Sequence, residues 1–463
     1  MKLNKEQYRA AHHLNGPMLV LAGPGSGKTH LLVERIRIMI EENHIPPESI
    51  LVITFSKKAA RQMQKRFEKR VKDTSYPVTF GTFHAVFYHI LKQYDPNISR
   101  LITEEEISLF VRHAITDSKA DSDFFRSEEN TGTIAGLISS YKNFGEEFFE
   151  RNEFAKAFEP YEKEEFKRIY EIYSESVVRA GLIDFDDMIV RCRKLLGKHE
   201  SILRKWQKIY RYFLVDEFQD INDAQYDILR LLAGDERNVF AVGDDDQSIY
   251  AFRGSRPQLM KKFKHQYVGC RQVTLTMNYR CCENVIGVAD AVIRHNIDRF
   301  ERPTQRHLPS KKGGSVMVVN SESTEVQSAF VCDTIEELTG NGVYKADEIA
   351  VLYRSDHCAL RFIKAAAKRG IHVNVMTAHA SKGLEFKCVF IISLQEGLFP
   401  HKKDMDGNSE EERRLMYVAI TRAIECLYMC TVSTEHGKRP SRFVLEAMKK
   451  NKYISDCLRL KRI

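Results

Sequence analysis

Short runs of apolar residues alternate along the chain with longer segments in which apolar and charged residues recur at helical spacing. In the first half, these strand-like runs cover residues 18–21, 50–54, 78–80, 212–215, 239–242 and 273–276. In the second half they cover residues 316–319, 349–352, 373–375, 389–392 and 426–429. Strands that alternate with helices are typical of parallel sheets covered by helices on both faces. The pattern therefore predicts an α/β protein with two parallel, doubly wound sheets.

One long segment departs from this alternation. Residues 90–190 are rich in Glu, Lys, Phe and Tyr and contain no clear strand, which predicts a helical insertion. A chain of 463 residues is also too long for one compact core. We therefore predict a first sheet domain from residues 1–89 and 191–276, a helical inserted subdomain at 90–190, and a second sheet domain at 277–463. The polar stretch 301–314 is expected to be an exposed loop.

The most specific motif follows the first apolar run. Residues 22–29 read Ala-Gly-Pro-Gly-Ser-Gly-Lys-Thr and lead into an amphipathic helix. Glycines let consecutive backbone N–H groups point at phosphate oxygens, the helix N-terminus favours negative charge, a lysine can reach the β- and γ-phosphates, and a threonine can hold Mg²⁺. The pattern predicts binding of a nucleoside triphosphate with Mg²⁺ by these residues: Gly23, Pro24, Gly25, Ser26, Gly27, Lys28 and Thr29.

Two other strand ends carry polar side chains that suit nucleotide hydrolysis. Asp216 and Glu217 follow the run at 212–215, where Asp216 can coordinate Mg²⁺ and Glu217 can orient or deprotonate the attacking water. Gln247 follows the run at 239–242, and its neutral amide can contact a γ-phosphate or the lytic water. Just beyond it lie candidate base-stacking and cationic side chains: Tyr250, Phe252 and Arg253.

With these motifs in place, the chain resembles the UvrD/Rep family of superfamily 1 DNA helicases. Further segments match that family in order along the chain: residues 3–7, 53–60, 81–84, 275–280, 377–386 and 411–423. The resemblance implies two RecA-like P-loop domains, with the predicted helical insertion in the first. It also implies ATP hydrolysis coupled to movement on single-stranded DNA.

The resemblance assigns roles to individual residues around the nucleotide. Gln7 would read the adenine edge, although Asn4 and Gln7 also match a helix capping box. Tyr279 would stack on the base, and Arg280 and Arg422 would act as arginine fingers on the γ-phosphate. Glu385 would meet the ribose, or cap a helix. His30 stands where many relatives place an arginine against the adenine, so base affinity is expected to be weaker or more dependent on pH.

The resemblance also assigns a DNA-binding surface of rings and phosphate contacts. Base stacking on aromatic side chains is indifferent to sequence, as a motor that moves along any strand requires. The expected residues are Phe55, Thr82, His84, Tyr250, Phe252, Arg253 and His379, with Lys57 on a phosphate. The expected substrates are single-stranded DNA and tailed duplex DNA.

The chain differs from the family in one large feature. The family has a second inserted subdomain before the motif at 377–386, and only residues 369–376 occupy that place here. The resemblance implies a 3′ to 5′ translocase and helicase of repair or replication, and the missing insertion predicts that its unwinding is limited unless a protein partner assists. Two alternatives stay open: a DNA-stimulated ATPase that remodels protein–DNA complexes without processive unwinding, and a nucleotide-switched DNA-binding module.

Composition adds little to this interpretation. A net charge of +8, from 71 basic and 63 acidic side chains, is compatible with nucleic acid without requiring it. The sequence has no apolar run long enough to span a membrane and no signal-peptide pattern at its start, so we expect a cytoplasmic protein. Its ten cysteines form no C-x-x-C pair, which argues against a structural zinc or iron–sulfur cluster.

Overall fold

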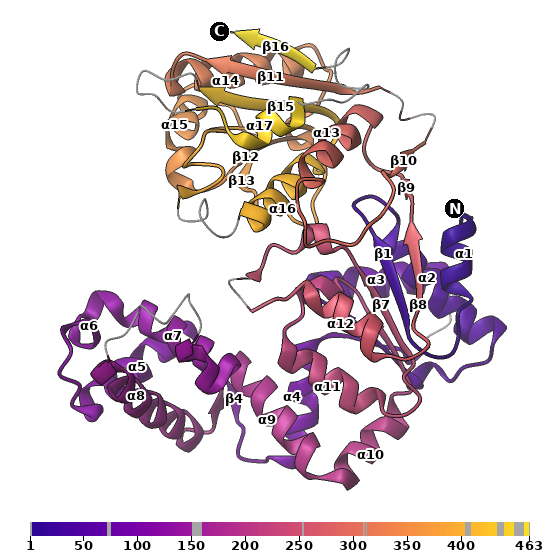
Figure 1. The fold of residues 1–463 in the computed structure, drawn as a ribbon, viewed down its shortest axis with the longest axis vertical. Coiled ribbons are helices and arrows are strands. Elements are labelled where there is room, and N and C mark those ends of the chain that lie inside the picture. Colours follow the sequence, from indigo (N-terminus) through magenta and orange to yellow (C-terminus); the bar gives the residue numbers. More distant parts are fainter. Residues whose placement is uncertain are drawn as a thin grey trace. The chain divides into compact units, whose positions relative to one another are not determined.

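The computed structural model describes residues 2–71, 76–150, 160–251, 254–308, 311, 313–402, 409–432, 439–448 and 458–462. These residues form two compact units, each built from segments that are distant in the sequence (Figure 1). Unit 1 contains residues 1–39, 216–220 and 240–463, and unit 2 contains residues 40–215 and 221–239. The three-part domain division expected from the sequence stays a prediction.

Three parallel strands of unit 1 carry the phosphate loop. β1 (Met18–Ala22) pairs with β7 (Val239–Gly243) on one side and with β8 (Arg271–Leu275) on the other. Every residue of β1 is buried, as expected for a central parallel strand. The helices of this part are α1 (Lys5–Ala11), α2 (Lys28–Arg37) and α12 (Gln258–Gln266). The chain therefore passes from a buried strand directly through the phosphate loop into α2.

A second sheet of unit 1 has six parallel strands in the order β13-β12-β14-β15-β11-β16. Their bounds are β11 (Ser315–Ser321), β12 (Ile349–Tyr353), β13 (Asn374–Thr377), β14 (Phe386–Ile391), β15 (Ala423–Val432) and β16 (Leu458–Arg462). The helices that contribute to the cores of this sheet are α13 (Glu283–Ile293), α14 (Thr324–Gly340), α15 (Leu360–Lys368), α16 (Ser409–Ile420) and α17 (Arg442–Met448). Unit 1 thus contains a complete doubly wound sheet.

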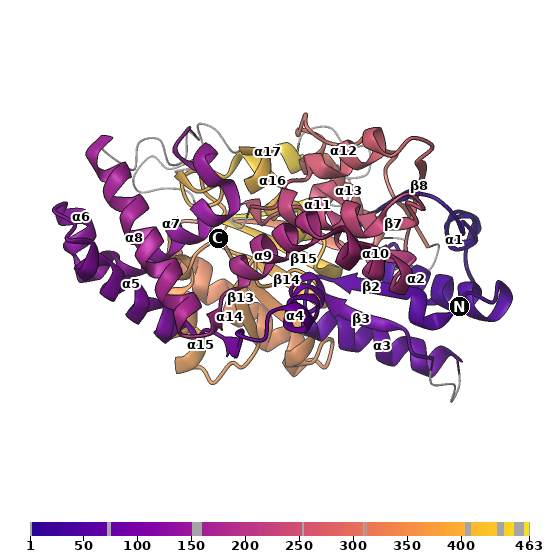
Figure 2. The same ribbon diagram turned by 90° about the horizontal axis from the view of Figure 1, so that it is seen from below.

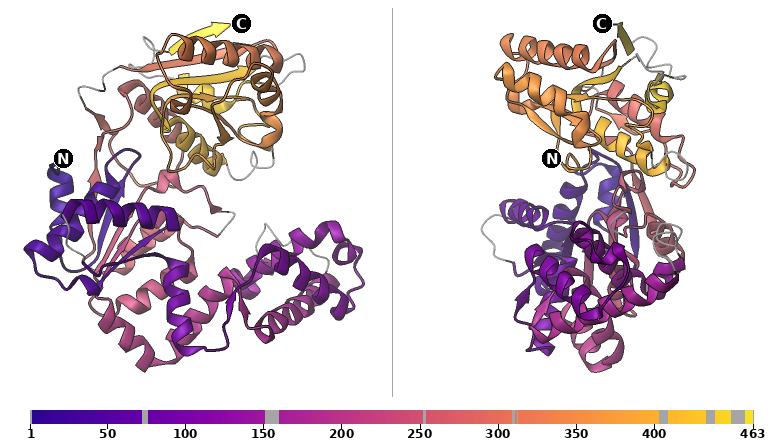
Figure 3. Two further views of the ribbon diagram at one scale, coloured as in Figure 1. Left: turned by 180° about the vertical axis from the view of Figure 1, so that it is seen from behind. Right: turned by 90° about the vertical axis from the view of Figure 1, so that its left-hand side faces the viewer.

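Alternation along the strands builds a separate core on each face of this sheet. In β14, Cys388 and Phe390 join the core that includes residues of α14 and α15, whereas Val389 and Ile391 join the core that includes residues of α13, α16 and α17. Successive strand residues point to opposite faces, so a continuous apolar run serves both cores. The right-hand view of Figure 3 shows helices on both sides of the sheet.

Unit 2 contains a smaller parallel arrangement. β2 (Ile50–Thr54) lies between β3 (Thr79–Thr82) and β6 (Tyr212–Val215). The helices associated with these strands are α3 (Lys57–Val71), α4 (Phe83–Tyr94), α9 (Phe185–Lys198), α10 (Glu200–Ile209) and α11 (Asp223–Ala233). On α3 the apolar side chains recur at helical spacing and are buried, while the basic ones between them are mostly exposed.

The insertion in unit 2 is helical, as predicted. It contains α5 (Glu104–Ser118), α6 (Asp123–Arg126), α7 (Thr131–Phe144) and α8 (Pro160–Arg179), and α5, α7 and α8 pack around an aromatic core (Figure 2). The expectation that this segment has no strand is wrong. β4 (Arg100–Leu101) pairs with β5 (Leu182–Ile183) in parallel. Two-residue strands give no periodic signal, and the partners lie far apart in the sequence, so this pairing was not visible there.

The sequence patterns located the longer strands well, and the α/β class with parallel sheets is confirmed. Each of the eleven predicted runs overlaps a strand of the structure, and the run at 212–215 coincides with β6. β16 and the short pair β9 (Met277–Asn278) and β10 (Arg306–His307) were not predicted. β10 lies within the segment expected to be only a loop. In the described part of the chain, no helix is long and apolar enough to cross a membrane.

Candidate nucleotide-binding and catalytic site

The phosphate loop adopts a backbone that requires glycine. Gly25 has φ +66° and Gly27 has φ +82°, both in the left-handed region. A Cβ on Gly25 would lie 2.6 Å from Asn278 Oδ1, and one on Gly27 would lie 2.8 Å from Gln7 Nε2. The loop is held from β9, where Asn278 Nδ2 donates to the Pro24 carbonyl over 2.8 Å. These constraints produce the narrow, glycine-lined turn at the start of α2 that phosphate binding needs.

Lys28 begins α2 and pairs with Glu217, at 3.1 Å from each carboxylate oxygen. Burial lowers the pKa of Lys28, but the carboxylates of Glu217, Asp216 and Asp244 outweigh burial and raise it. For Glu217 the balance is opposite: burial raises its pKa, but Lys28, Lys382 and a bond from Gln219 lower it to about 2. Glu217 is therefore an ionised acceptor at neutral pH, as a water-orienting carboxylate must be.

Glu217 also has a backbone of the kind found at functional sites. Its φ is +52°, which is rare for a residue with a side chain. Gln219 in the following turn donates to the Glu217 carboxylate over 2.6 Å and to Asp220 over 3.2 Å. The side-chain oxygen Oε1 of Gln219 in turn accepts the Asp244 backbone N–H over 2.9 Å. Gln219 was not predicted as a site residue, although it lies only two positions after Glu217; its side chain connects the segments that follow two strands.

The residues expected to hold Mg²⁺ suit that ion only together with a nucleotide. Burial and the neighbouring Glu217 raise the pKa of Asp216 to about 7, so this carboxylate is in strongly negative surroundings that a cation would relieve. No group of three or more His, Cys, Asp or Glu side chains in the described ranges could hold a metal. Mg²⁺ in phosphate-transferring sites usually takes one or two protein ligands and completes its shell with phosphates and water. Thr29 and Asp216 fit that pattern.

The structure brings Gln7 and Tyr279 to the phosphate loop. Gln7 Nε2 donates to the Ser26 carbonyl over 3.0 Å, and Asn4 Nδ2 donates to the Tyr279 hydroxyl over 2.9 Å. The capping box is confirmed, since the Asn4 and Gln7 side chains each accept the other's backbone N–H. Adenine contacts by Gln7 and Tyr279 stay predictions, as does that of His30, whose Nε2 is buried without a hydrogen-bond partner.

The two predicted arginine fingers differ in their surroundings. Arg280 Nε lies 2.6 Å from a carboxylate oxygen of Glu385, so the residue expected at the ribose pairs with the residue expected at the γ-phosphate. Arg422 is 1% exposed and donates to the carbonyls of Val418 and Leu384, each over 2.9 Å. Burial and nearby Arg280 lower the pKa of Arg422 to about 10. Arg280, Glu385 and Arg422 therefore form one cluster, and both fingers stay predictions.

Lys382 is a further residue whose importance was not recognised from the sequence, although it lies in the motif at 377–386. Its ammonium donates to Asp220 over 2.5 Å and to the Gln247 carbonyl over 2.8 Å. The same ammonium lies 4.8 Å from the centre of the Tyr250 ring. Lys382 thus contacts a strand-end acid, the predicted γ-phosphate sensor and a predicted DNA-stacking residue, all within unit 1.

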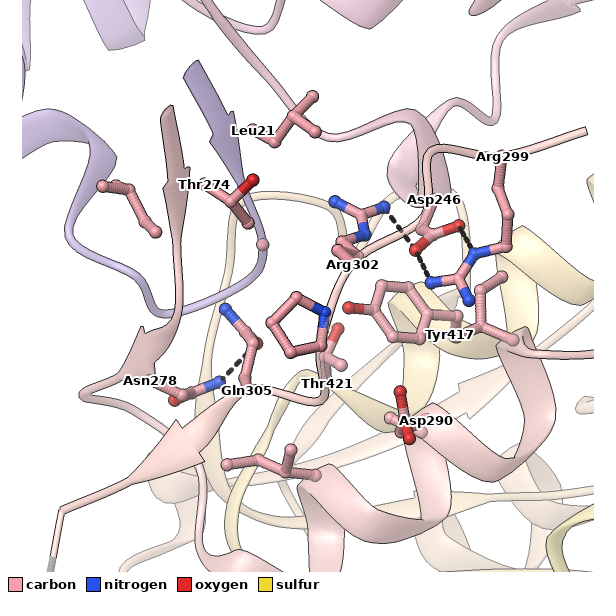
Figure 4. A pocket seen from close by; sticks show the side chains of 16 residues that line it. Leu21, Asp246, Thr274, Asn278, Asp290, Arg299, Arg302, Gln305, Tyr417 and Thr421 are labelled. Carbon is pink, nitrogen blue, oxygen red and sulfur yellow. Dashed lines mark hydrogen bonds and ion pairs between the residues drawn. The ribbon is translucent and has the colours of Figure 1, made fainter. Parts of the chain in front are cut away.

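A pocket lies behind the phosphate loop (Figure 4). Its wall includes Leu21 and Gly23 from the loop side and Arg302, Gln305 and Tyr417 from elsewhere in unit 1. The Gln305 amide oxygen accepts a bond from Asn278 over 3.2 Å, and the Gln305 nitrogen would lie 2.6 Å from a Cβ on Gly23. All three loop glycines are therefore in close contact with another part of unit 1.

The predicted DNA-binding residues are divided between the units. In unit 2, Phe55 and Lys57 are exposed after β2, the Thr82 hydroxyl caps α4, and the His84 ring packs edge-on against Phe185. Burial lowers the pKa of His84. Two others lie in unit 1, namely Tyr250 and His379, and the last two, Phe252 and Arg253, lie outside the described residues. The DNA-binding assignment stays a prediction.

The expectation about the second insertion can be compared with the structure directly. α15 ends at Lys368 and β13 begins at Asn374, and all residues between them are described. Five residues therefore join a helix to the next strand of the same sheet. No subdomain is inserted at this point of the chain.

Comparisons with known proteins agree with the motifs. Residues 3–268 match the model of the UvrD/REP helicase N-terminal domain, and residues 273–376 and 363–434 match the UvrD-like helicase C-terminal domain. An ATP-dependent DNA helicase PcrA of Leuconostoc citreum is 31% identical over 93% of this chain and 57% of its own length. A probable DNA helicase of Mycoplasma pneumoniae is 29% identical over 96% of this chain and 86% of its own length.

The chain spans 57% of the length of the Leuconostoc citreum PcrA helicase and 50% of the length of one from Bacillus subtilis, about half of each. A solved C-terminal domain of a possible DNA helicase from Lactobacillus plantarum is 18% identical, covers 39% of this chain and 98% of its own, and has a TM-score of 0.28, too low for a comparison of folds. The family models together span most of the chain. The chain therefore belongs to the UvrD/REP helicase family.

Proposed function

We propose that this protein hydrolyses ATP with Mg²⁺ and uses the energy to move along single-stranded DNA. The observation that carries the proposal is the connected set of groups around Glu217. Lys28 and Gln219 both contact its carboxylate, and Gln219 continues to Asp244 and from there to Gln247. Such a set suits a site that orients a water against a phosphate, because each group is fixed by another.

The coupling to DNA is argued from Lys382. One ammonium contacts Asp220 and Gln247 of the predicted hydrolytic site and the ring of Tyr250, a predicted base-stacking residue. A base that stacks on Tyr250 and displaces its ring would therefore also shift Lys382 and its contact with Gln247, the predicted γ-phosphate sensor. The names of the relatives as DNA helicases, and the family itself, favour DNA as the polymer. A 3′ to 5′ direction and a role in repair or replication come from the family resemblance alone.

The first experiment measures ATP turnover with oligo-dT, blunt duplex DNA and single-stranded RNA added separately. We expect strong stimulation by oligo-dT and little by blunt duplex. The matched control is Lys28→Ala, which removes a phosphate contact and is expected to abolish turnover with every polymer. An ATP turnover rate that is the same with and without each of the three polymers would contradict the proposed motor.

A second candidate function is a DNA-stimulated ATPase that remodels protein–DNA complexes without processive unwinding. The direct passage from α15 to β13 favours it, because no second subdomain is present there to contact a duplex junction. Strand displacement on duplexes of rising length with 3′ or 5′ tails separates the two functions. We expect the chain alone to unwind only short duplexes beside a 3′ tail; processive unwinding of long duplexes would show that the second subdomain is not needed.

A further inference from the structure

Three consecutive acids lie buried at the end of β7. Asp244, Asp245 and Asp246 are 0%, 2% and 1% exposed. They face two arginines, Arg299 and Arg302, which come from the segment between α13 and β10. Figure 4 shows both arginines beside Asp246. Three carboxylates and two guanidinium groups leave the cluster with one excess negative charge. Buried like charges at this spacing separate unless cations hold them.

The two arginines serve different acids. Arg299 contacts Asp246 only, with Nε at 3.0 Å and Nη2 at 2.6 Å from its two oxygens. Arg302 Nη2 lies 2.7 Å from Asp244 Oδ1 and 2.9 Å from Asp245 Oδ1, and it also contacts Asp246. The Arg302 side chain is 9% exposed. Arg302 is therefore the cation that connects all three acids.

Asp244 connects Arg302 to the predicted hydrolytic site. Its Oδ1 accepts Arg302 and the Asp246 backbone N–H, while its Oδ2 accepts the Gln247 side-chain amide over 2.5 Å. Its own backbone N–H donates to Gln219, which holds Glu217. One carboxylate thus fixes the amide of Gln247, and its backbone fixes the residue that orients Glu217.

We propose that Arg302 is a positioning residue for the hydrolytic site. By holding Asp244 Oδ1, it fixes the direction of Oδ2 and hence the Gln247 amide that would meet the γ-phosphate or the water. This role rests on the proposed ATP hydrolysis. The planar guanidinium suits it, because the group stays charged and its rigid plane gives the N–H groups of Nη2 a fixed direction toward the acids. A lysine in this place supplies charge without the same geometry.

The test uses two variants of the full chain with single-stranded DNA present. Arg302→Lys keeps the charge, and Arg302→Gln with Asp245→Asn keeps the net charge of the cluster. Both are expected to lower kcat about 10- to 100-fold, as for a displaced catalytic group, with the affinity for a fluorescent ATP analogue within about threefold of wild type. In a Gln247→Ala background, Arg302→Lys should lower kcat far less, because both changes act through one residue.

Hydrogen exchange gives a readout that does not need turnover. The backbone N–H groups of Asp246 and Gln247 both bond to Asp244, so their exchange should become faster in the Arg302 variants. Unchanged exchange would overturn the proposal, whatever the ATPase activity. The two proposals can also fail separately. If exchange is fast in the Arg302 variants but the wild-type protein shows no DNA-stimulated ATP turnover, Arg302 still holds the loop and the proposed function is refuted.

The matched control is a bidentate ion pair at another place in unit 1. Arg442 Nη2 lies 2.8 Å from Glu396, and Arg442 Nε contacts both oxygens of the same carboxylate. Arg442→Gln should change neither kcat nor exchange at residues 244–247. If it lowers kcat as much as Arg302→Lys does, or if the effects of Arg302→Lys and Gln247→Ala multiply fully, Arg302 has only a structural role.

Discussion

The clearest energetic prediction concerns Asp245, the middle acid of the buried cluster. Burial, together with the neighbouring Asp246 and Asp244, raises its pKa from 3.8 to about 6, although Arg302 opposes the shift. The folded protein therefore binds the Asp245 proton more tightly than the unfolded chain. Stability falls as the pH rises from about 4 to about 6 and is constant above that range, because the charged form is the disfavoured one. Asp245→Asn removes this loss.

The size of the effect follows from the shift. A change of about two pKa units corresponds to about 3 kcal/mol at 1.36 kcal/mol per unit. Part of this loss is already present at pH 5. The advantage of Asp245→Asn over wild type should therefore grow by about 1 kcal/mol between pH 5 and pH 8. The asparagine keeps one oxygen to accept from Arg302 or from the Phe300 backbone N–H, both of which contact Asp245.

The assay is urea-induced unfolding of both proteins at pH 5, 6, 7 and 8, followed by circular dichroism. The control is Asp298→Asn, because a bond from Lys261 lowers the pKa of Asp298. A carboxyl group whose pKa is lowered on folding stabilises the folded state fully at any pH well above its ordinary pKa. The difference in unfolding free energy between Asp298→Asn and wild type should therefore not change from pH 5 to pH 8. If the Asp245→Asn difference is equally independent of pH, Asp245 is ionised over the whole range and its burial costs less than about 3 kcal/mol.

Three predictions concern the hydrolytic site. Glu217→Gln should abolish turnover and still bind ATP in a fluorescence titration, whereas near-normal hydrolysis would refute its role toward water. Arg280→Ala and Arg422→Ala should each lower kcat, by up to about 10³-fold, far more than they weaken ATP binding, and normal hydrolysis with DNA bound would make that arginine structural. Burial already raises the pKa of Asp220 to about 6, and Lys382→Ala removes the ammonium that stabilises its ionised form. Because Asp220 is ionised at pH 8 and mostly protonated at pH 5, urea unfolding should show a larger loss of stability at pH 8. An equal loss at both pH values would contradict the buried ion pair.

The sequence was sufficient for features that depend on local pattern. Continuous apolar runs marked buried parallel strands, because such strands face helices on both sides. The tight turn of the phosphate loop was likewise predictable, since glycine adopts the left-handed backbone found at Gly25 and Gly27 more readily than any other residue. The capping box at Asn4 and Gln7 could also be read from spacing alone.

What could not be predicted depends on contacts between distant segments. Arg302 lies in the polar stretch that was expected to be a loop and Arg299 lies just before it, and neither gave a signal, yet both contact acids more than fifty residues away. Three acids after a buried strand do imply a need for cations, but sequence does not say which cations. The β4–β5 pair was missed for a related reason, because its two-residue strands lie far apart in the sequence and give no periodic signal.

The paired charges of unit 1 bear on how a nucleotide would act. Lys28, expected at the phosphates, holds Glu217, and Arg280, expected at the γ-phosphate, holds Glu385. A triphosphate is a stronger partner for both cations than a single carboxylate, since it presents several charged oxygens. We therefore expect ATP to take Lys28 from Glu217, which leaves Glu217 with Gln219 and available to a water. The catalytic carboxylate would then become free only when the phosphates that it serves are in place.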